Sequence, residues 1–176
     1  MRMKKSFVFG LLAVATASQA IVLPAAFFPT PAALRENFDT TAIGVYNTLP
    51  VFGVPAVMNR IGTGGGLVVR PYPGVNTVPN MCVGDNVDAE IISAIPMRRF
   101  GGYFRSGVFG VFSSTATFRF YDAANNPIGS VVAPMTMGFT WVGWRTFPKW
   151  RRVEIIGAVP GFPGTVAMDS LRIRPF

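Results

Sequence analysis

The chain of 176 residues has 16 basic and 8 acidic side chains, a formal charge of +8, one cysteine and no histidine. Histidine is the usual general base and the commonest zinc ligand, so its absence argues against a catalytic Ser or Cys triad and against a zinc site. A single cysteine, Cys82, excludes an intramolecular disulfide, and its neighbours Met81 and Val83 predict a buried thiol that acts as a small hydrophobic side chain. The length suits one domain.

Residues 1–20 have the pattern of a cleavable secretory signal peptide. Three basic residues among the first five precede an apolar run of 11 residues, and the small residues Ser18 and Ala20 occupy positions −3 and −1. A transmembrane anchor is the alternative, but such a span needs about 20 apolar residues. Cleavage near residue 25 or 26 is a second alternative. We expect export to the cell exterior, with the periplasm or cell surface as other locations, and no membrane span afterwards. Loss of three basic residues would lower the charge from +8 to +5.

Residues 21–34 form an apolar lead-in segment with three prolines and no charge. Proline at this density prevents a regular helix or a central strand, so an extended segment is predicted. Because it is more apolar than an ordinary linker, it should pack on the domain of residues 35–176 or on a partner. Addition of this segment to the sheet edge of a neighbouring molecule would make the chain a structural, self-assembling protein.

The segment Thr115–Tyr121 alternates between apolar and polar residues, which predicts a strand with Ala116, Phe118 and Phe120 on its buried face. The residues that follow, 122–127, are a cluster typical of turns, so residues 115–133 are predicted to form a hairpin.

Other short apolar stretches are separated by Gly, Pro and Asn. In residues 87–95 the alternation places Val87, Ala89, Ile91, Ser93 and Ile95 on one face. In residues 171–174 it places Leu171 and Ile173 inward and two arginines outward. Further strands are predicted near 66–70, 108–112, 139–144 and 152–157. About eight short antiparallel strands in an all-β chain indicate a β-sandwich or jelly roll.

Four stretches in this order resemble secreted bacterial β-sandwich domains of proteins sorted by a PEP-CTERM tail: ENFD at 36–39, RFGGYF at 99–104, FYDAANNPIG at 120–129, and RVEIIG with AMDSLRI at 152–157 and 167–173. The resemblance covers residues 36–174 and lacks the sorting tail. It implies a fold like that of galactose-binding and carbohydrate-binding jelly rolls. It also implies a structural calcium held by Glu36, Asp39 and Asp169, because calcium takes six to eight oxygen ligands. The alternative is that these acidic residues serve turns without an ion.

Aromatic and basic residues are densest in residues 138–152, which contain all three tryptophans. Aromatic rings can stack on sugars, and arginine can bind carboxylates, sulfates or phosphates. We predict Trp141, Trp150, Arg145 and Arg151 as ligand contacts and Trp144 as a core residue. Nucleic acid would also suit aromatic residues interleaved with basic ones, but it would depend on charge alone and is disfavoured as a partner.

Enzyme signatures are weak. The glycines of residues 62–66 lack the Lys and Ser or Thr of a phosphate-binding loop. Asp88 and Glu90 share a strand face, but nothing else in the sequence indicates the cleft that glycosidase carboxylates need. The sequence therefore favours a secreted, non-catalytic binding module whose ligand is an extracellular glycan or surface polymer. The alternative is a structural or self-assembling protein of the matrix or cell surface.

Overall fold

The computed structural model describes residues 21–22, 33–53, 55–71, 80–85, 87–106, 115–157 and 166–175. Within these ranges the chain forms twelve strands, and every pairing between them is antiparallel. The strands are β1 (Ile21–Val22), β2 (Leu34–Glu36), β3 (Gly44–Tyr46), β4 (Thr48–Val51), β5 (Ala56–Ile61), β6 (Gly66–Pro71), β7 (Asn80–Asp85), β8 (Asp88–Ser106), β9 (Thr115–Tyr121), β10 (Pro127–Pro134), β11 (Thr140–Gly157) and β12 (Val166–Arg174).

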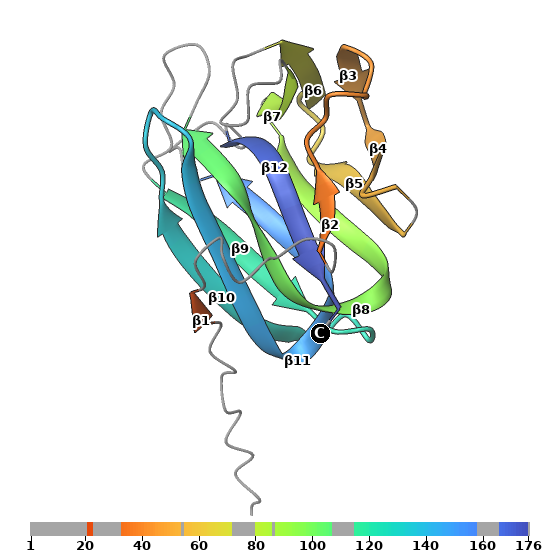
Figure 1. Cartoon of the computed structure of the whole chain (residues 1–176), viewed down its shortest axis with the longest axis vertical. Helices are drawn as coiled ribbons and strands as arrows, with labels where there is room; N and C mark the ends of the chain where they lie inside the picture. The colour runs from red at the N-terminus through yellow and green to blue at the C-terminus, as the bar shows by residue number, and fades with distance from the viewer. Residues whose placement is uncertain are drawn as a thin grey trace, which may run out of the picture.

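Two sheets share the long strands β8 and β11. In the first sheet, residues 140–145 of β11 pair with 99–104 of β8, which pairs with β12, and β12 pairs with β2 and β7. In the second sheet, the later half of β11 pairs with β9 and with the early half of β8, which pairs with β5. Strands β6 and β3 extend the first sheet, and β10 and β4 are edges of the second. Figure 1 shows β11, β8, β12 and β2 crossing the middle of the molecule.

Both shared strands change sheets at a bend that contains a proline. The regular register between β11 and β8 is interrupted between Arg145 and Arg152, with Trp150 opposite Met97 within the gap. Pro148 lies in this part of β11, and Pro96 lies in the matching part of β8. Because proline cannot donate to a sheet ladder, it is tolerated where pairing is interrupted.

Aromatic side chains from the two sheets pack against each other in the core. Phe100 and Trp144 from the first sheet lie 6.1 Å and 4.2 Å, between ring centroids, from Phe118 of the second. Trp144 is 1% exposed, which confirms its prediction as a core residue. The inner faces therefore form one interior, and the prediction of an antiparallel β-sandwich is confirmed.

Several predicted elements match the structure. Ala116, Phe118 and Phe120 are fully buried, and β9 and β10 form the predicted hairpin. Leu171 and Ile173 are also fully buried. The stretch 66–70 lies in β6, whereas 139–144 and 152–157 prove to be parts of one bent strand, β11, and 108–112 falls outside the described residues.

Two strand predictions are corrected. The inward alternation of residues 87–95 holds as far as Ser93, but Ile95 is 40% exposed because β8 enters its bend there. The expected number of about eight strands is too low, because the described chain also contains strands of two to four residues such as β1 and β3.

The first and last parts of the lead-in segment both join the first sheet. Ile21 and Val22 pair with Arg145 and Trp144 of β11, and Leu34 begins β2, which pairs with β12. The intervening residues 23–32 and the predicted signal at 1–20 lie outside the described residues. In the part of the chain that the structure describes, no helix is long and apolar enough to cross a membrane.

Candidate functional site

Arginine side chains form a row across three adjacent strands on the outer face of the first sheet. Arg145 of β11 lies directly opposite Arg99 of β8, which lies directly opposite Arg174 of β12. Each is next in sequence to a buried residue, respectively Trp144, Phe100 and Ile173, so strand alternation points the arginines outward. With strands about 4.8 Å apart, the row spans roughly 10 Å.

A second row lies beside the first. Arg172 of β12 lies opposite Gly101 of β8 on one side and opposite Arg35 of β2 on the other. Arg35 is exposed, whereas Arg172 and the three arginines of the first row are half-buried. The five residues Arg35, Arg99, Arg145, Arg172 and Arg174 are called the arginine face below.

Charges of the same sign therefore lie close together on this face. Burial and the neighbouring charges of Arg174 and Arg145 lower the pKa of Arg99, and burial and the charge of Arg35 lower the pKa of Arg172. Like charges directly opposite each other in a sheet destabilise it, by roughly 0.2–1 kcal/mol per pair. An anion bound at this face would reduce that repulsion.

Trp141 lies on the same outward face, four residues before Arg145 on β11. Its indole covers Gly101, because a Cβ atom on that glycine would lie 2.8 Å from Trp141 Cζ2. The Tyr103 ring meets the indole edge to face at 5.3 Å, and the Arg172 guanidinium lies 5.1 Å from the Trp141 ring centroid. These contacts hold a half-buried aromatic ring at the border of the arginine face.

The outer face of the second sheet has a different charge pattern. Arg152 contacts Glu154 at 2.8 Å and Glu90 at 3.7 Å, and Arg119 lies 4.0 Å from Glu154. The Tyr121 hydroxyl also donates a hydrogen bond of 2.7 Å to Glu154. Acidic and basic groups are thus paired on the second sheet, whereas the first sheet carries the arginine face.

The predicted ligand contacts do not all lie together. Trp141 and Arg145 share the outer face of the first sheet, as expected. Trp150 is fully buried, with its ring 6.0 Å from Phe100 and 6.1 Å from Phe120, and this corrects its prediction as a ligand contact. The physical reason is that β11 crosses between the sheets at this residue, so its side chain fills the interior.

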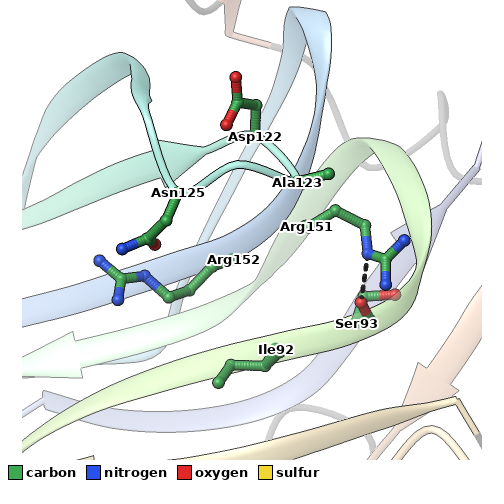
Figure 2. A pocket seen from close by; sticks show the side chains of 7 residues that line it. All are labelled: Ile92, Ser93, Asp122, Ala123, Asn125, Arg151 and Arg152. Carbon is green, nitrogen blue, oxygen red and sulfur yellow. Dashed lines mark hydrogen bonds between the residues drawn. The ribbon is translucent and has the colours of Figure 1, made fainter.

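Arg151 lies in a separate pocket at the bend. Figure 2 shows it beside Ser93 and below the turn that joins β9 and β10. The pocket has a volume of about 500 Å³, and none of its lining residues belongs to the arginine face. Arg151 Nε donates a 2.7 Å hydrogen bond to the Ser93 carbonyl, and Asp122 in the same pocket accepts from the backbone amides of its own turn. These groups serve the local structure of the bend.

The structure does not bring the three predicted calcium ligands together. As expected for a sandwich, β2 and β12 pair, with Glu36 opposite Leu171. However, no group of three or more acidic or cysteine side chains among the described residues could hold a metal ion. Both Glu36 carboxylate oxygens instead accept backbone amides, from Phe38 at 2.8 Å and from Phe52 at 2.9 Å.

Asp169 and Asp39 are the other two residues of the predicted calcium site. Asp169 is 3% exposed and accepts a 2.6 Å hydrogen bond from the Ser170 amide, while burial raises the pKa of Asp39. These interactions correct the calcium prediction at Glu36, Asp39 and Asp169. The carboxylates of Glu36 and Asp169 bind backbone amides beside turns and strands, which is the alternative stated for these residues from the sequence.

Cys82 is confirmed as a buried residue. It is fully buried, and its Sγ lies 3.9 Å from the Met58 sulfur. Burial, with a smaller effect from the nearby charge of Glu36, raises the pKa of the Cys82 thiol to about 12. Such a thiol stays protonated at neutral pH, which suits a packing role and not a reactive one.

No protein-family model and no curated protein matches the chain. Among solved structures, it is similar to an arabinose-bound GH51 α-L-arabinofuranosidase, with 15% identity and a TM-score of 0.49 over 80% of this chain and 26% of that one. It is also similar to a family 29 carbohydrate-binding module (6% identity, TM-score 0.41, 67% of this chain and 91% of that one). A third is the K1 cleaved adhesin domain of Lys-gingipain from Porphyromonas gingivalis (12% identity, TM-score 0.37, 82% and 98%). This chain therefore spans about a quarter of the arabinofuranosidase, and its function is inferred from its own residues.

Proposed function

We propose that this chain is a secreted, non-catalytic module that binds glycans at the cell exterior through the outer face of its first sheet. The observation that carries the proposal is the position of Trp141, an outward indole over Gly101 with Arg145 on the same strand face. A fixed indole offers a flat apolar surface for a sugar ring, and arginine donates hydrogen bonds to its oxygens.

The geometry leaves room for an extended ligand. Arg145 lies four positions after Trp141, which corresponds to roughly 13 Å along an extended strand. The aromatic contact and the guanidinium groups would therefore hold different parts of one glycan chain. Binding of this kind requires no covalent step.

The non-catalytic part of the proposal is supported by the ion pairs that two opposed carboxylates make. Glu90 and Glu154 lie directly opposite each other, a pattern that the sequence did not reveal. Both contact the Arg152 guanidinium, so each carboxylate is engaged in an ion pair on the sheet surface. Secretion is supported by the signal pattern of residues 1–20, and mass spectrometry of the exported protein would identify its first residue.

The test is a glycan array probed with the protein from residue 21 onward. We expect binding that is lost in Trp141→Ala and retained in Val132→Ala. Val132 is 61% exposed and lies on β10 of the second sheet, so it is a matched control for the loss of an exposed apolar side chain. Absence of binding to every polysaccharide would contradict the proposal, as would equal loss in both variants.

A structural, self-assembling role is the second candidate, and one observation favours it. Strand β3 pairs only with β6 in the described chain, and Ile43 and Val45 beside and within it are 64% and 70% exposed. An exposed apolar edge strand can pair with another copy. Light scattering at increasing concentration tests this, because association should be weakened by Val45→Lys. A monodisperse monomer at high concentration, unchanged by deletion of residues 21–34, contradicts assembly.

A further inference from the structure

We propose that the glycan bound at this face is an anionic polysaccharide, with its carboxylate or sulfate groups held along the row formed by Arg145, Arg99 and Arg174. This inference rests on the glycan-binding function proposed above and names the class of ligand. The arginine face presents guanidinium groups from five residues. A planar guanidinium group can bind a carboxylate or sulfate through two parallel hydrogen bonds.

The spacing of the row suits a ligand with repeated charges. The three arginines lie directly opposite one another on adjacent strands, so neighbouring guanidinium stems start about 4.8 Å apart. A single small anion would contact one or two of them. A polymer that carries a charge on successive sugar units could contact the whole row while one of its sugars stacks on Trp141.

Part of the row is held in place before any ligand binds. The Arg145 guanidinium lies 4.2 Å from the centroid of the Phe147 ring, and Arg98 lies 5.2 Å from the same ring. In the second row, the Arg172 guanidinium lies 5.1 Å from the Trp141 ring centroid. Stacking on aromatic rings restricts these long side chains, so less conformational entropy is lost when they bind an anion.

The like charges on this face supply a reason for an anionic ligand. Neighbouring arginines and burial lower the pKa of Arg99 and Arg172, so the charged forms are held at some cost in free energy. On the second sheet Arg119 and Arg152 contact carboxylates of the same face. Five arginines are thus gathered on the side of the sandwich that also carries Trp141.

A polysaccharide fits this face better than nucleic acid does. Sequence-tolerant binding of a single strand uses several aromatic platforms on which successive bases stack. Here Trp141 is one platform, and Tyr103 meets it edge to face, so the second ring does not continue a stacking surface. Nucleic acid is therefore treated as an outcome of the test.

The experiment measures binding to four probes: polygalacturonate, its carboxyl-reduced neutral counterpart, a sulfated galactan and oligo(dT). The variants are the double substitution Arg145→Gln with Arg174→Gln, and Arg119→Gln as a matched control from the second sheet. We expect the wild-type protein to bind the two anionic glycans at least about tenfold more tightly than the neutral one, since hydrogen bonds to charged groups are the stronger ones. The double variant should lose this preference, the control should keep it, and added salt should weaken the anionic binding.

The outcomes separate this inference from the function on which it rests. Equal affinity for polygalacturonate and its neutral counterpart, unchanged in the double variant, would overturn the anionic ligand and leave glycan binding intact. Binding to none of the three glycans would overturn the anionic ligand, and absence of binding on the whole glycan array would overturn both. Equal or tighter binding of oligo(dT) would overturn the inference in favour of a nucleic acid site. Because the double variant removes two like charges, urea unfolding should show that it is at least as stable as the control, and a less stable double variant would contradict the electrostatic reasoning.

Discussion

Replacement of Gly101 by alanine tests whether the Trp141 indole lies against the sheet. The added Cβ would lie 2.8 Å from Trp141 Cζ2 and 3.0 Å from both the Gly143 Cα and the Val142 carbonyl oxygen. Ordinary contacts begin near 3.4 Å, so the overlap with the indole is 0.6 Å, the difference between 3.4 and 2.8. The indole can swing away, but the two backbone atoms of the paired strand cannot. We expect a loss of about 1–3 kcal/mol in the free energy of unfolding, as for other overpacked sites.

Two measurements report this result. Urea unfolding gives the stability, and iodide quenching of fluorescence gives the exposure of Trp141, because Trp144 and Trp150 are 1% and 0% exposed. Gly101→Ala should increase the quenchable fraction and weaken glycan binding. The control is Gly138→Ala, whose Cβ would meet no atom within 4 Å, and it should change stability by no more than about 0.5 kcal/mol. If the two variants behave alike in stability and quenching, the placement of Trp141 over Gly101 is refuted.

Three further predictions concern stability. Trp150→Ala should cost about 3–5 kcal/mol in urea unfolding because it leaves a cavity in the core, and loss of glycan binding without loss of stability would contradict its buried role. Cys82, whose thiol pKa is raised from 9.0 to about 12, should react slowly with thiol reagents at pH 8 in the folded protein. Since the unfolded thiol ionises first, stability should fall as pH rises from about 9 to 12, and Cys82→Ala should remove that part of the slope. Glu36→Ala should cost about 1–3 kcal/mol by leaving the Phe38 and Phe52 amides without their acceptor, and Glu36→Gln, which keeps one oxygen acceptor, should cost less in the same assay.

The sandwich was predictable because the alternation of apolar and polar residues that identifies a strand lies within the sequence of that strand alone. Alternation in residues 115–121 and 171–174 depends only on which face of a strand meets the core, and both assignments hold in the structure. The bend was not predictable from alternation. In β8 the pattern that runs through Ser93 fails at Ile95, because the strand passes from one sheet to the other and its inner side changes. The same crossing explains why Trp150, in an apparently exposed basic stretch, is buried.

The site was only partly predictable for a different reason. Alternation predicts that Arg172 and Arg174 point outward. Trp141 and Arg145 are predicted as ligand contacts because they lie in a segment dense in aromatic and basic residues. However, the row formed by Arg145, Arg99 and Arg174 depends on the register of three strands that are far apart in the sequence. A single sequence carries no direct signal for that register. Arg99 is therefore not among the site residues predicted from the sequence.

The bend also determines how charge is distributed along β8 and β11, which bears on the proposed anionic ligand. The formal charge of +8, or +5 without residues 1–20, would attract a polyanion only weakly if it were spread over the whole surface. Strand β8, however, supplies Glu90 to the second sheet and Arg99 to the first, and β11 likewise supplies Glu154 and Arg145. Each of these two strands thus places a glutamate on the second sheet and an arginine on the first. Glu90 and Glu154 therefore lie away from the arginine face, where five positive charges are gathered, and exchange of charge between the two halves of either strand should weaken anion binding while net charge stays constant.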